Sequence, residues 1–338
     1  MPEQETKNLN QNQRVLANKF EADCDSLKES YGIGGLGPGI GPLYHYTSAV
    51  GLKGILETNV LFATHFEYLN DVSELKYGHD LLRSFVSEKA PYSILEDEDF
   101  DETNYNVDLA ADALRATKAV FRHFVSNQKY FADIDSYITS FCGKDDLLSQ
   151  WRGYGSQNGG GYCIGFEFKL NHMSYEDEPK MRQSTLLHAI LYDRKQQQAL
   201  LSDLWDLSYR LLLAGSPDGG YRKNLDSDPA FCYYRSFIVG KIYLIINSYK
   251  HEAFKQEEET RLFTSRSPGY PDVFVRESKG LLIPYVQVPI KKPDIKLVSI
   301  KIGPNLHPTK ARRSVEMWRK KHSHSSVNVT ESNIPLGG

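Results

Sequence analysis

The order of strand-like and helix-like segments is the feature that most constrains the fold of this 338-residue chain. Short runs rich in β-branched and aromatic residues predict strands at 43–47, 61–66, 136–142, 161–168, 185–192, 260–264, 281–288, 294–302 and 326–329. Helical spacing of apolar residues predicts helices at 48–58, 72–88, 107–127, 195–213, 228–249 and 308–321. The two kinds do not alternate evenly, as a doubly wound fold requires. We therefore expect an α+β fold with a largely antiparallel sheet.

The first 42 residues precede the first predicted strand and combine a polar helical lead-in with the glycine-rich linker YGIGGLGPGIGP. Gly32, Gly34 and Gly37 fit the pattern G-x-G-x-x-G, but no strand precedes them and prolines follow. A dinucleotide-binding turn needs a strand before it and a helix after it, so this reading is rejected. We expect a single domain over 43–338, with helical insertions at about 72–130 and 195–249.

Composition and charge exclude several classes of protein. The net charge of −3 provides no overall basic field for non-specific binding of nucleic acid. Four widely spaced cysteines, without a C-x-x-C pair, argue against a zinc knuckle or a disulfide scaffold and fit a reducing cytoplasm. The amino-terminal residues lack the apolar core of a signal peptide, and no apolar run is long enough to span a bilayer. We expect a cytoplasmic protein without membrane contact.

The stretch LYHYTSAVGLKGIL, residues 43–56, places a histidine between two tyrosines at the end of a predicted strand. Strand alternation puts His45 and Thr47 on one face and Tyr44 and Tyr46 on the other. Ser48 is a suitable N-cap for the helix that follows, which would fix the end of the strand. A histidine held in this way can orient a ligand hydroxyl. A buried histidine with one satisfied hydrogen bond explains the pattern equally well.

The stretch SYITSFCGKDDLLSQWRGYGSQNGGGYCIGFEF, residues 136–168, predicts strand, short helix, glycine turn and strand. Leu147, Leu148 and Trp151 share the buried stripe of the helix, so Trp151 is predicted to be a core residue. Tyr154 lies one turn further on, before a run of small residues, where its ring can stack on a flat ligand ring. Ser156 lacks the flanking glycines of a nucleophile elbow, which excludes a serine hydrolase on this motif.

The stretch YKHEAFKQEEETRLF, residues 249–263, contains three consecutive glutamates. HEAFK lacks the second histidine of H-E-x-x-H, so we expect no metal site there. A strand entered near Gln256 would place Glu257, Glu259 and Arg261 on one face and Glu258 on the other. Arg261 would relieve the repulsion between the two carboxylates and keep one of them ionised against a sugar hydroxyl or a developing positive charge. A solvated strand edge is the alternative.

Several motifs occur in an order that resembles a bacterial family known only by the label domain of unknown function 2971. They are LYHYTS with GLKGILETNVLFAT, YLNDVSEL, SFC with DLLSQWRGYG and GGGYCIGF, KHEAFKQEEETRL, IGPN and VNVTESNIPLG. The resemblance covers roughly residues 43–337. More distantly, that family resembles ADP-ribosyltransferases of the histidine-tyrosine-glutamate type, which include diphtheria-toxin-like enzymes, poly-ADP-ribose polymerases and NAD-consuming RNA phosphotransferases. This second resemblance implies a split, largely antiparallel sheet.

The resemblance also implies roles for individual residues. His45, with Thr47 and the following LKGIL, matches the histidine that binds the nicotinamide ribose. Tyr154 matches the tyrosine that stacks on nicotinamide, and Glu257 or Glu259 matches the glutamate that polarises the ribose 2′-hydroxyl. Cleavage of the bond to nicotinamide passes through an oxocarbenium-like state, which a nearby carboxylate stabilises. We favour Glu259 because it lies deeper in the predicted strand, with Arg261 next on the same face.

These observations lead to three hypotheses. The first is an NAD-consuming ADP-ribosyltransferase or NAD glycohydrolase, without a metal and with a protein or nucleic acid acceptor, which by analogy would suit a bacterial toxin or anti-phage defence. The second is a non-catalytic module that senses a nucleotide or binds a protein. The third is an RNA 2′-phosphotransferase, which predicts a cluster of arginines. Arg152, Arg261 and the run KARR at 310–313 are its candidates.

Overall fold

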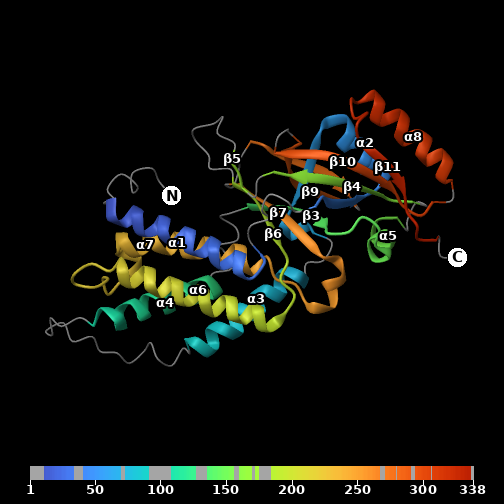
Figure 1. The fold of residues 1–338 in the computed structure, drawn as a ribbon. Coiled ribbons are helices and arrows are strands. Elements are labelled where there is room, and N and C mark those ends of the chain that lie inside the picture. The colour runs from blue at the N-terminus through green and yellow to red at the C-terminus, as the bar shows by residue number, and fades with distance from the viewer. Residues whose placement is uncertain are drawn as a thin grey trace. The chain divides into compact units, whose positions relative to one another are not determined.

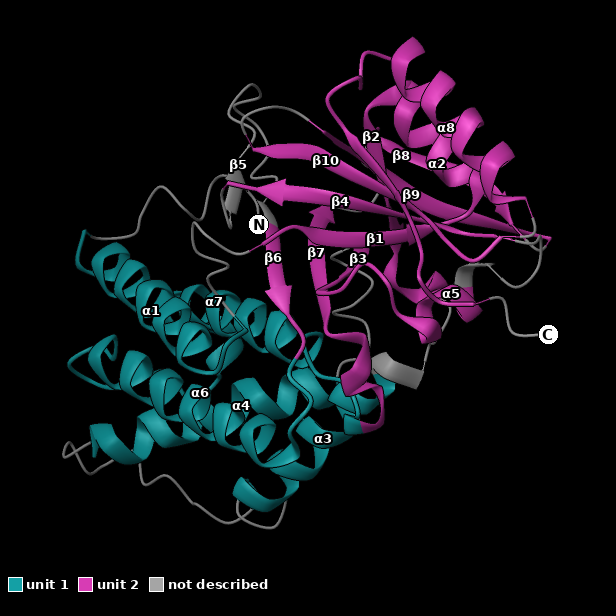
Figure 2. Ribbon diagram, turned by 45° about the vertical axis from the view of Figure 1, so that its right-hand side comes forward, with its two compact units in different colours: residues 1–34, 73–131, 191–252 teal, residues 35–72, 132–190, 253–338 magenta. Residues whose placement is uncertain are grey.

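The chain divides into two compact units, each assembled from three separate segments (Figure 2). The helical unit comprises residues 1–34, 73–131 and 191–252, and the sheet unit comprises residues 35–72, 132–190 and 253–338. The computed structural model describes residues 11–33, 41–69, 73–90, 108–126, 135–155, 160–169, 172–174, 184–266, 271–278, 280–290, 294–305 and 307–335. The lead-in helix and both predicted helical insertions contribute to the helical unit.

Among the residues that the structure describes, five long helices belong to the helical unit (Figure 1). They are α1 (Gln11–Ser30), α3 (Ser73–Lys89), α4 (Leu109–Ser126), α6 (Arg194–Ala214) and α7 (Pro229–Ile246). Two aspartates set the starts of the last two helices: the Asp193 side chain accepts from Gln196 N, and that of Asp228 accepts from Phe231 N. Such caps satisfy backbone N–H groups that the first turn leaves without partners.

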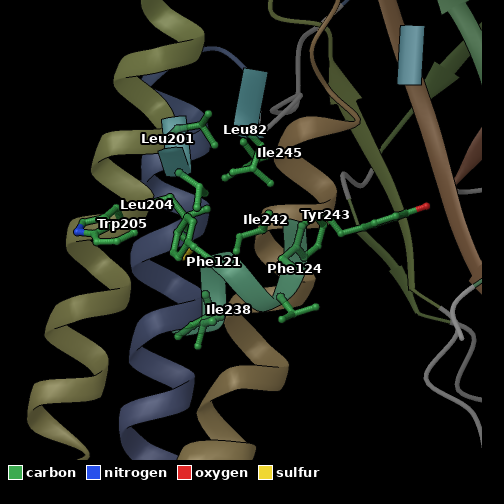
Figure 3. Close-up of a cluster of buried hydrophobic side chains, with 14 of the residues drawn as sticks. Leu82, Phe121, Phe124, Leu201, Leu204, Trp205, Ile238, Ile242, Tyr243 and Ile245 are labelled. Carbon is green, nitrogen blue, oxygen red and sulfur yellow. The ribbon is translucent and has the colours of Figure 1, made fainter. Parts of the chain in front are cut away.

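The core of the helical unit lies between these helices (Figure 3). The helix predicted at 228–249 is confirmed as α7, and Tyr234, Ile238, Ile242 and Ile245 form a fully buried stripe on it. Gly78 of α3 allows a particularly close approach to α7, since a Cβ built at Gly78 would lie 2.2 Å from the Ile246 carbonyl oxygen. Close backbone packing at this point requires glycine.

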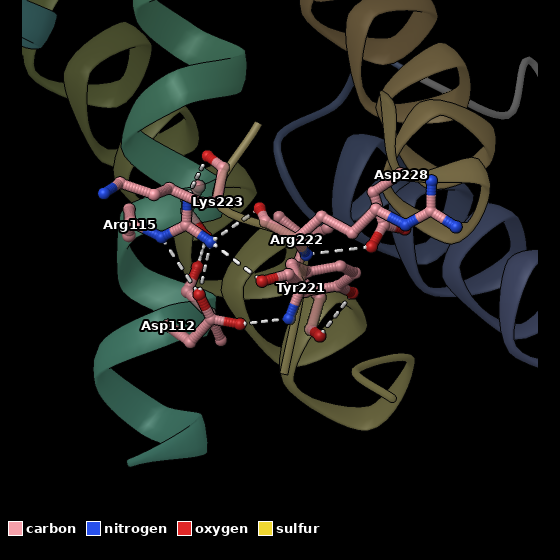
Figure 4. Close-up of polar contacts among 9 residues, drawn as sticks. Asp112, Arg115, Tyr221, Arg222, Lys223 and Asp228 are labelled. Carbon is pink, nitrogen blue, oxygen red and sulfur yellow. Dashed lines mark hydrogen bonds and ion pairs between the residues drawn. The ribbon is translucent and has the colours of Figure 1, made fainter. Parts of the chain in front are cut away.

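A polar network fastens the connection between α6 and α7 to α4 (Figure 4). Asp112 of α4 is buried; its Oδ2 accepts from Tyr221 N at 2.6 Å, and its Oδ1 accepts from Arg115 Nη2 at 2.6 Å. Asp228 Oδ2 accepts from Arg222 N at 3.0 Å. A buried carboxylate is tolerated when it is paired and hydrogen-bonded in this way. The network is therefore a structural tie of the helical unit.

The sheet unit contains eleven strands among the described residues. They are β1 (Leu43–Thr47), β2 (Val60–His65), β3 (Asp135–Cys142), β4 (Tyr162–Phe168), β5 (His172–Ser174), β6 (Ser184–Ala189), β7 (Glu259–Arg266), β8 (Val273–Ser278), β9 (Leu281–Pro289), β10 (Ile295–Ile302) and β11 (Asn328–Glu331). All strand pairs are antiparallel except β10 with β11. The expected α+β fold with a largely antiparallel sheet is confirmed.

The sheet branches at β3. One path runs β11-β10-β4-β1-β3-β2-β9-β8, while β7, β6 and β5 follow one another from β3. Strand β7 pairs with β3 over Asp135–Cys142, so β1 and β2 share the other edge of β3. β1 meets that edge at Cys142, and β2 meets it at Tyr137 and Ile138. The sheet is thus split between β1 and β2, beside Thr139 and Ser140.

Helices cover both faces of the sheet unit. α2 (Ala49–Thr58) and α8 (Pro308–Lys321) lie side by side on one face, and their buried residues join the main core of this unit (Figures 1 and 2). The prediction for α2 is confirmed, because Ser48 Oγ accepts from Gly51 N and Leu52, Ile55 and Leu56 are buried. α5 (Leu148–Gly155) packs on the other face through Trp151.

Most predicted elements occur within a few residues of their expected positions, and two strands escaped prediction. β5 has three residues, too few to show a pattern. β8, VFVRES, is largely exposed at the end of the strand order and lacks a buried face that would give it an alternating pattern. The acidic tract at 96–102, most of the glycine-rich linker and residues 156–159 lie outside the described residues.

Candidate functional site

Glu259 and Arg261 form a buried ion pair at the start of β7. Arg261 Nε donates to Glu259 Oε1 at 2.8 Å, and Arg261 Nη2 donates to Glu259 Oε2 at 3.0 Å. Only 7% of Glu259 and 2% of Arg261 are exposed. Ser140 Oγ of β3 adds a third hydrogen bond, to Glu259 Oε1 at 2.7 Å. The predicted shared face of Glu259 and Arg261 is confirmed, and the alternative of a solvated strand edge is wrong for these two residues.

The turn before β7 determines that the strand begins at Glu259. A 3-10 helix covers Glu252–Glu257, and Glu258 then adopts a left-handed backbone conformation, with φ of +46°. The Glu258 carbonyl accepts from Gly143 N at 3.0 Å, which docks the turn onto the end of β3. The register pairs Glu259 with Cys142 and Arg261 with Ser140. This register explains why the Ser140 hydroxyl reaches the Glu259 carboxylate.

Glu257 does not belong to the strand, so the prediction that alternation places it beside Glu259 is wrong. It ends the 3-10 helix, and its carbonyl accepts from Cys142 Sγ at 2.6 Å. The sequence QEEET carries no apolar alternation that would reveal where the strand begins. Glu258 is exposed and forms an ion pair with Lys144. Glu258 also precedes β7, so the strand alternation that was predicted to orient its side chain does not apply to it.

His45 lies at the split in the sheet. Its Nδ1 is 3.0 Å from the Ser140 carbonyl oxygen, and its ring centroid is 5.8 Å from that of Phe141. Because a carbonyl only accepts, Nδ1 carries the proton, and Nε2 of the neutral ring is an acceptor. Burial lowers the pKa of His45, although the hydrogen bond to Ser140 opposes that shift. His45 therefore donates a hydrogen bond to the Ser140 carbonyl group at the split between β1 and β2.

The His45 ring and the Glu259 carboxylate approach β3 from opposite faces. His45 contacts Phe141, whereas Glu259 accepts from the hydroxyl of the preceding residue, Ser140. Neighbouring side chains of a strand point to opposite faces. Ser140 joins the two through its own atoms, with the carbonyl bound to His45 and the hydroxyl bound to Glu259. The structure thus connects the two predicted site residues without placing their side chains on one face of β3.

Thr47 and Tyr154 are the remaining predicted binding residues. Thr47 is buried at the end of β1 opposite Tyr162, and a Cβ on Gly51 would lie 2.0 Å from its Oγ1. Thr47 therefore packs against the first turn of α2. Tyr154 belongs to α5, but its side chain lies outside the described part of the structure. Its stacking role stays a prediction.

The helix that carries Tyr154 is firmly anchored. Trp151 is buried, and its ring packs edge-on against that of Tyr46, with the two ring centroids 4.8 Å apart. Its Nε1 donates to Asp146 Oδ1 at 2.7 Å. Its predicted core role is confirmed. The prediction for Leu148 is wrong, because 46% of it is exposed. Leu148 is the first residue of α5, and the preceding Leu147 packs instead against the cluster that contains Trp151, so the expected stripe of apolar positions loses one member.

Two residues of this region escaped the sequence analysis. Ser140 is a small polar residue in the strand YITSFC, and that pattern does not predict a hydrogen bond from Ser140 to a carboxylate. His188 of β6 pairs in register with Arg261 and is buried, with its ring centroid 5.5 Å from that of Phe263. Only the pairing order of β3, β7 and β6 brings these side chains together, and sequence spacing does not report that order.

Two negative findings apply to the part of the chain that the structure describes. There, no group of three or more histidine, cysteine, aspartate or glutamate residues is arranged to hold a metal ion. In the same part, none of the helices has both the length and the apolar character needed to cross a membrane.

Comparison with known families finds a match over the middle of the chain. Residues 150–262 match the family described as Protein of unknown function (DUF2971). This match supports the resemblance seen in the motifs, and it includes most of α5, β4, the helices α6 and α7, and the first residues of β7. Comparison with curated proteins and with solved structures found no match. The family description carries no activity, so the chemistry must be argued from the residues.

Proposed function

We propose that the sheet unit is an NAD-consuming ADP-ribosyltransferase or NAD glycohydrolase with Glu259 as its catalytic carboxylate. The observation that carries this proposal is the bidentate contact of Arg261 with Glu259, completed by the Ser140 hydroxyl. An arginine is always protonated, and its charge favours the ionised form of a neighbouring carboxylate. A fixed, ionised carboxylate in a buried setting is the group needed to stabilise a developing positive charge.

The reaction breaks the bond between C1′ of the ribose and the nicotinamide nitrogen. The bonding electron pair leaves with the nitrogen, so the pyridinium becomes neutral nicotinamide and positive charge develops on the ribose. Glu259 stabilises that charge. An acceptor nucleophile or water then bonds to C1′ and loses its proton. Nothing in this sequence of steps requires a metal ion.

The remaining predicted residues hold the substrate in this proposal. The Nε2 acceptor of neutral His45 takes a hydrogen bond from a ribose hydroxyl, and Tyr154 stacks on the nicotinamide ring. Thr47 holds the end of β1 against α2, and Arg261 orients the carboxylate. His45 and Glu259 meet β3 from opposite faces, so the ribose would have to lie across the split between β1 and β2, where Ser140 joins them.

A second candidate is a nucleotide-sensing module without turnover. The hydrogen bonds that the Glu259 carboxylate already accepts favour it. Glu259 Oε1 already accepts from Ser140 and Arg261, and Oε2 accepts from Arg261. A carboxylate engaged in this way also serves as a structural ion pair. The third hypothesis, phosphate transfer from RNA, has less support: Arg261 is buried against Glu259, whereas Arg152 is exposed on α5 and Arg313 is exposed on α8.

Two measurements on the purified protein separate these candidates. Chromatography of NAD incubations, with and without protein and nucleic acid acceptors, measures the release of nicotinamide. Calorimetric titration with NAD, ADP-ribose and cyclic nucleotides measures binding. Release of nicotinamide supports the enzyme, and binding without release supports the sensor. If NAD is not cleaved and none of these nucleotides is bound, both proposals fail.

A further inference from the structure

The helix α8 concentrates positive charge on the sheet unit. Its sequence, PTKARRSVEMWRKK, holds six lysines and arginines and one glutamate, whereas the whole chain has a net charge of −3. The candidate site on β3 and β7 makes no use of these residues. A strongly basic helix on a slightly acidic protein marks a local patch that attracts anions.

Two of the six cations, Arg312 and Arg319, make contacts that hold the helix in place. Arg312 Nη1 lies 3.3 Å from Glu331 Oε1, and its Nη2 donates to the Val329 carbonyl at 3.3 Å, which fastens α8 to β11. Arg319 pairs with Glu316 within the helix at 2.6 Å, and its Nη1 donates to the carbonyl groups of His324 and Ser325 beyond the end of the helix. These arginines are therefore structural.

Three other cations form one exposed stripe. Lys310, Arg313 and Lys320 are separated by three and seven residues, which places them on one side of a helix, and all three are exposed. Among the described residues, none of them has a carboxylate within ion-pair distance. At about 1.5 Å of rise per residue, the stripe extends over roughly 15 Å.

The opposite side of α8 is fixed in the core. Ala311 and Val315 are buried in the main core of the sheet unit. Lys321 Nζ lies 4.6 Å from the centre of the Trp318 ring. Figure 1 shows α8 lying along α2 at the surface of this unit. The cations are thus presented by a helix that is already ordered, so binding an anion requires little further ordering of the backbone.

We propose that the stripe of Lys310, Arg313 and Lys320 binds the phosphate groups of a nucleic acid. Several anions spaced along a line, each met by one cation, are what a phosphate backbone offers. An anionic membrane fits less well, because a helix that binds a bilayer inserts its apolar side, and here Ala311 and Val315 are buried. Met317 is the large apolar residue that α8 exposes. This inference concerns binding alone and does not depend on the proposed NAD chemistry.

The test is fluorescence anisotropy of a labelled single-stranded RNA of about 20 nucleotides, titrated with the full chain at about 50 to 200 mM salt. The test variant carries Lys310→Gln, Arg313→Gln and Lys320→Gln. The matched control carries Lys19→Gln, Lys76→Gln and Lys195→Gln, three exposed lysines of the helical unit. Both variants remove three positive charges from exposed positions.

The stripe variant is expected to bind the RNA at least about tenfold more weakly than the wild type. Its plot of log affinity against log salt should lose about 2 units of slope, since each contact with a single strand contributes about 0.7. The control should match the wild type. Equal losses in both variants would overturn the proposal, as would a wild type that binds no RNA at about 50 mM salt. Binding to phosphatidylglycerol vesicles without binding to RNA would overturn it too.

Discussion

Arg261 holds Glu259 through two nitrogens, at 2.8 Å and 3.0 Å, in a part of β7 where both side chains are buried. The two residues are two positions apart on the same strand, so the contact follows directly from strand alternation. Each of these two buried charges thus has the other as an ion-pair partner. Both the stability of the start of β7 and the proposed chemistry depend on this contact.

Removal of either charge of this pair should destabilise the protein strongly. Glu259→Gln and Arg261→Met are each expected to lower the free energy of unfolding by about 3–5 kcal/mol, because each leaves a buried charge without its partner. The double variant should recover part of that loss. Urea denaturation of the four proteins measures the coupling. Losses that simply add in the double variant would show that the two side chains do not support each other.

The acid side of the stability profile should depend on His45. Burial lowers its pKa in the folded state, so the unfolded chain takes up the proton first as the pH falls below about 6.5. The stabilisation is fully present above that pH and is lost as the pH falls toward the folded pKa. His45→Gln should therefore lose less stability than the wild type between pH about 7 and about 5. Parallel profiles from denaturation at each pH would contradict this assignment.

Two helix-interior glycines of the helical unit should respond oppositely to alanine. Gly78→Ala places a Cβ 2.2 Å from the Ile246 carbonyl oxygen and is expected to cost about 1–3 kcal/mol of stability. Gly240→Ala meets no atom within 4 Å and should gain about 0.5–1 kcal/mol from helix propensity. Thermal unfolding compares the two. Equal effects would mean that α3 and α7 do not approach as closely as described.

Tyr46→Phe should loosen the attachment of α5. The Tyr46 hydroxyl donates to the Lys144 carbonyl at 2.9 Å and accepts from Leu147 N at 3.0 Å. Its removal leaves both backbone groups without this partner and should cost about 1–3 kcal/mol. Tyr68→Phe, at a position with 39% exposure, is the control and should stay within about 0.5 kcal/mol of the wild type. Chemical denaturation of both variants measures the difference.

Elements with their own local signals could be predicted from the sequence. The start of α2 follows from Ser48, and the buried stripe of α7 follows from its helical spacing. The start of β7 could not be placed, because three glutamates in succession carry no alternation and a left-handed residue, Glu258, precedes the strand. Local residue patterns therefore located the elements more reliably than their exact ends.

The candidate site was only partly predictable for a different reason. The contact between Glu259 and Arg261 lies within one strand, so alternation was enough to find it. Ser140 reaches Glu259 across β3 and β7, which are separated by more than a hundred residues in the chain. Pairing between distant strands depends on the complete sheet, so neither that contact nor the position of His45 relative to Glu259 could be derived from spacing.

Release of nicotinamide from NAD tests most directly whether Glu259 is the catalytic carboxylate. Wild type, Glu259→Gln and the exposed control Glu258→Gln are assayed where circular dichroism shows all three folded. We expect release by the wild type and by Glu258→Gln, with a loss on the order of a hundredfold or more in Glu259→Gln while NAD binding persists. Full activity in folded Glu259→Gln, or a greater loss in Glu258→Gln, would contradict it.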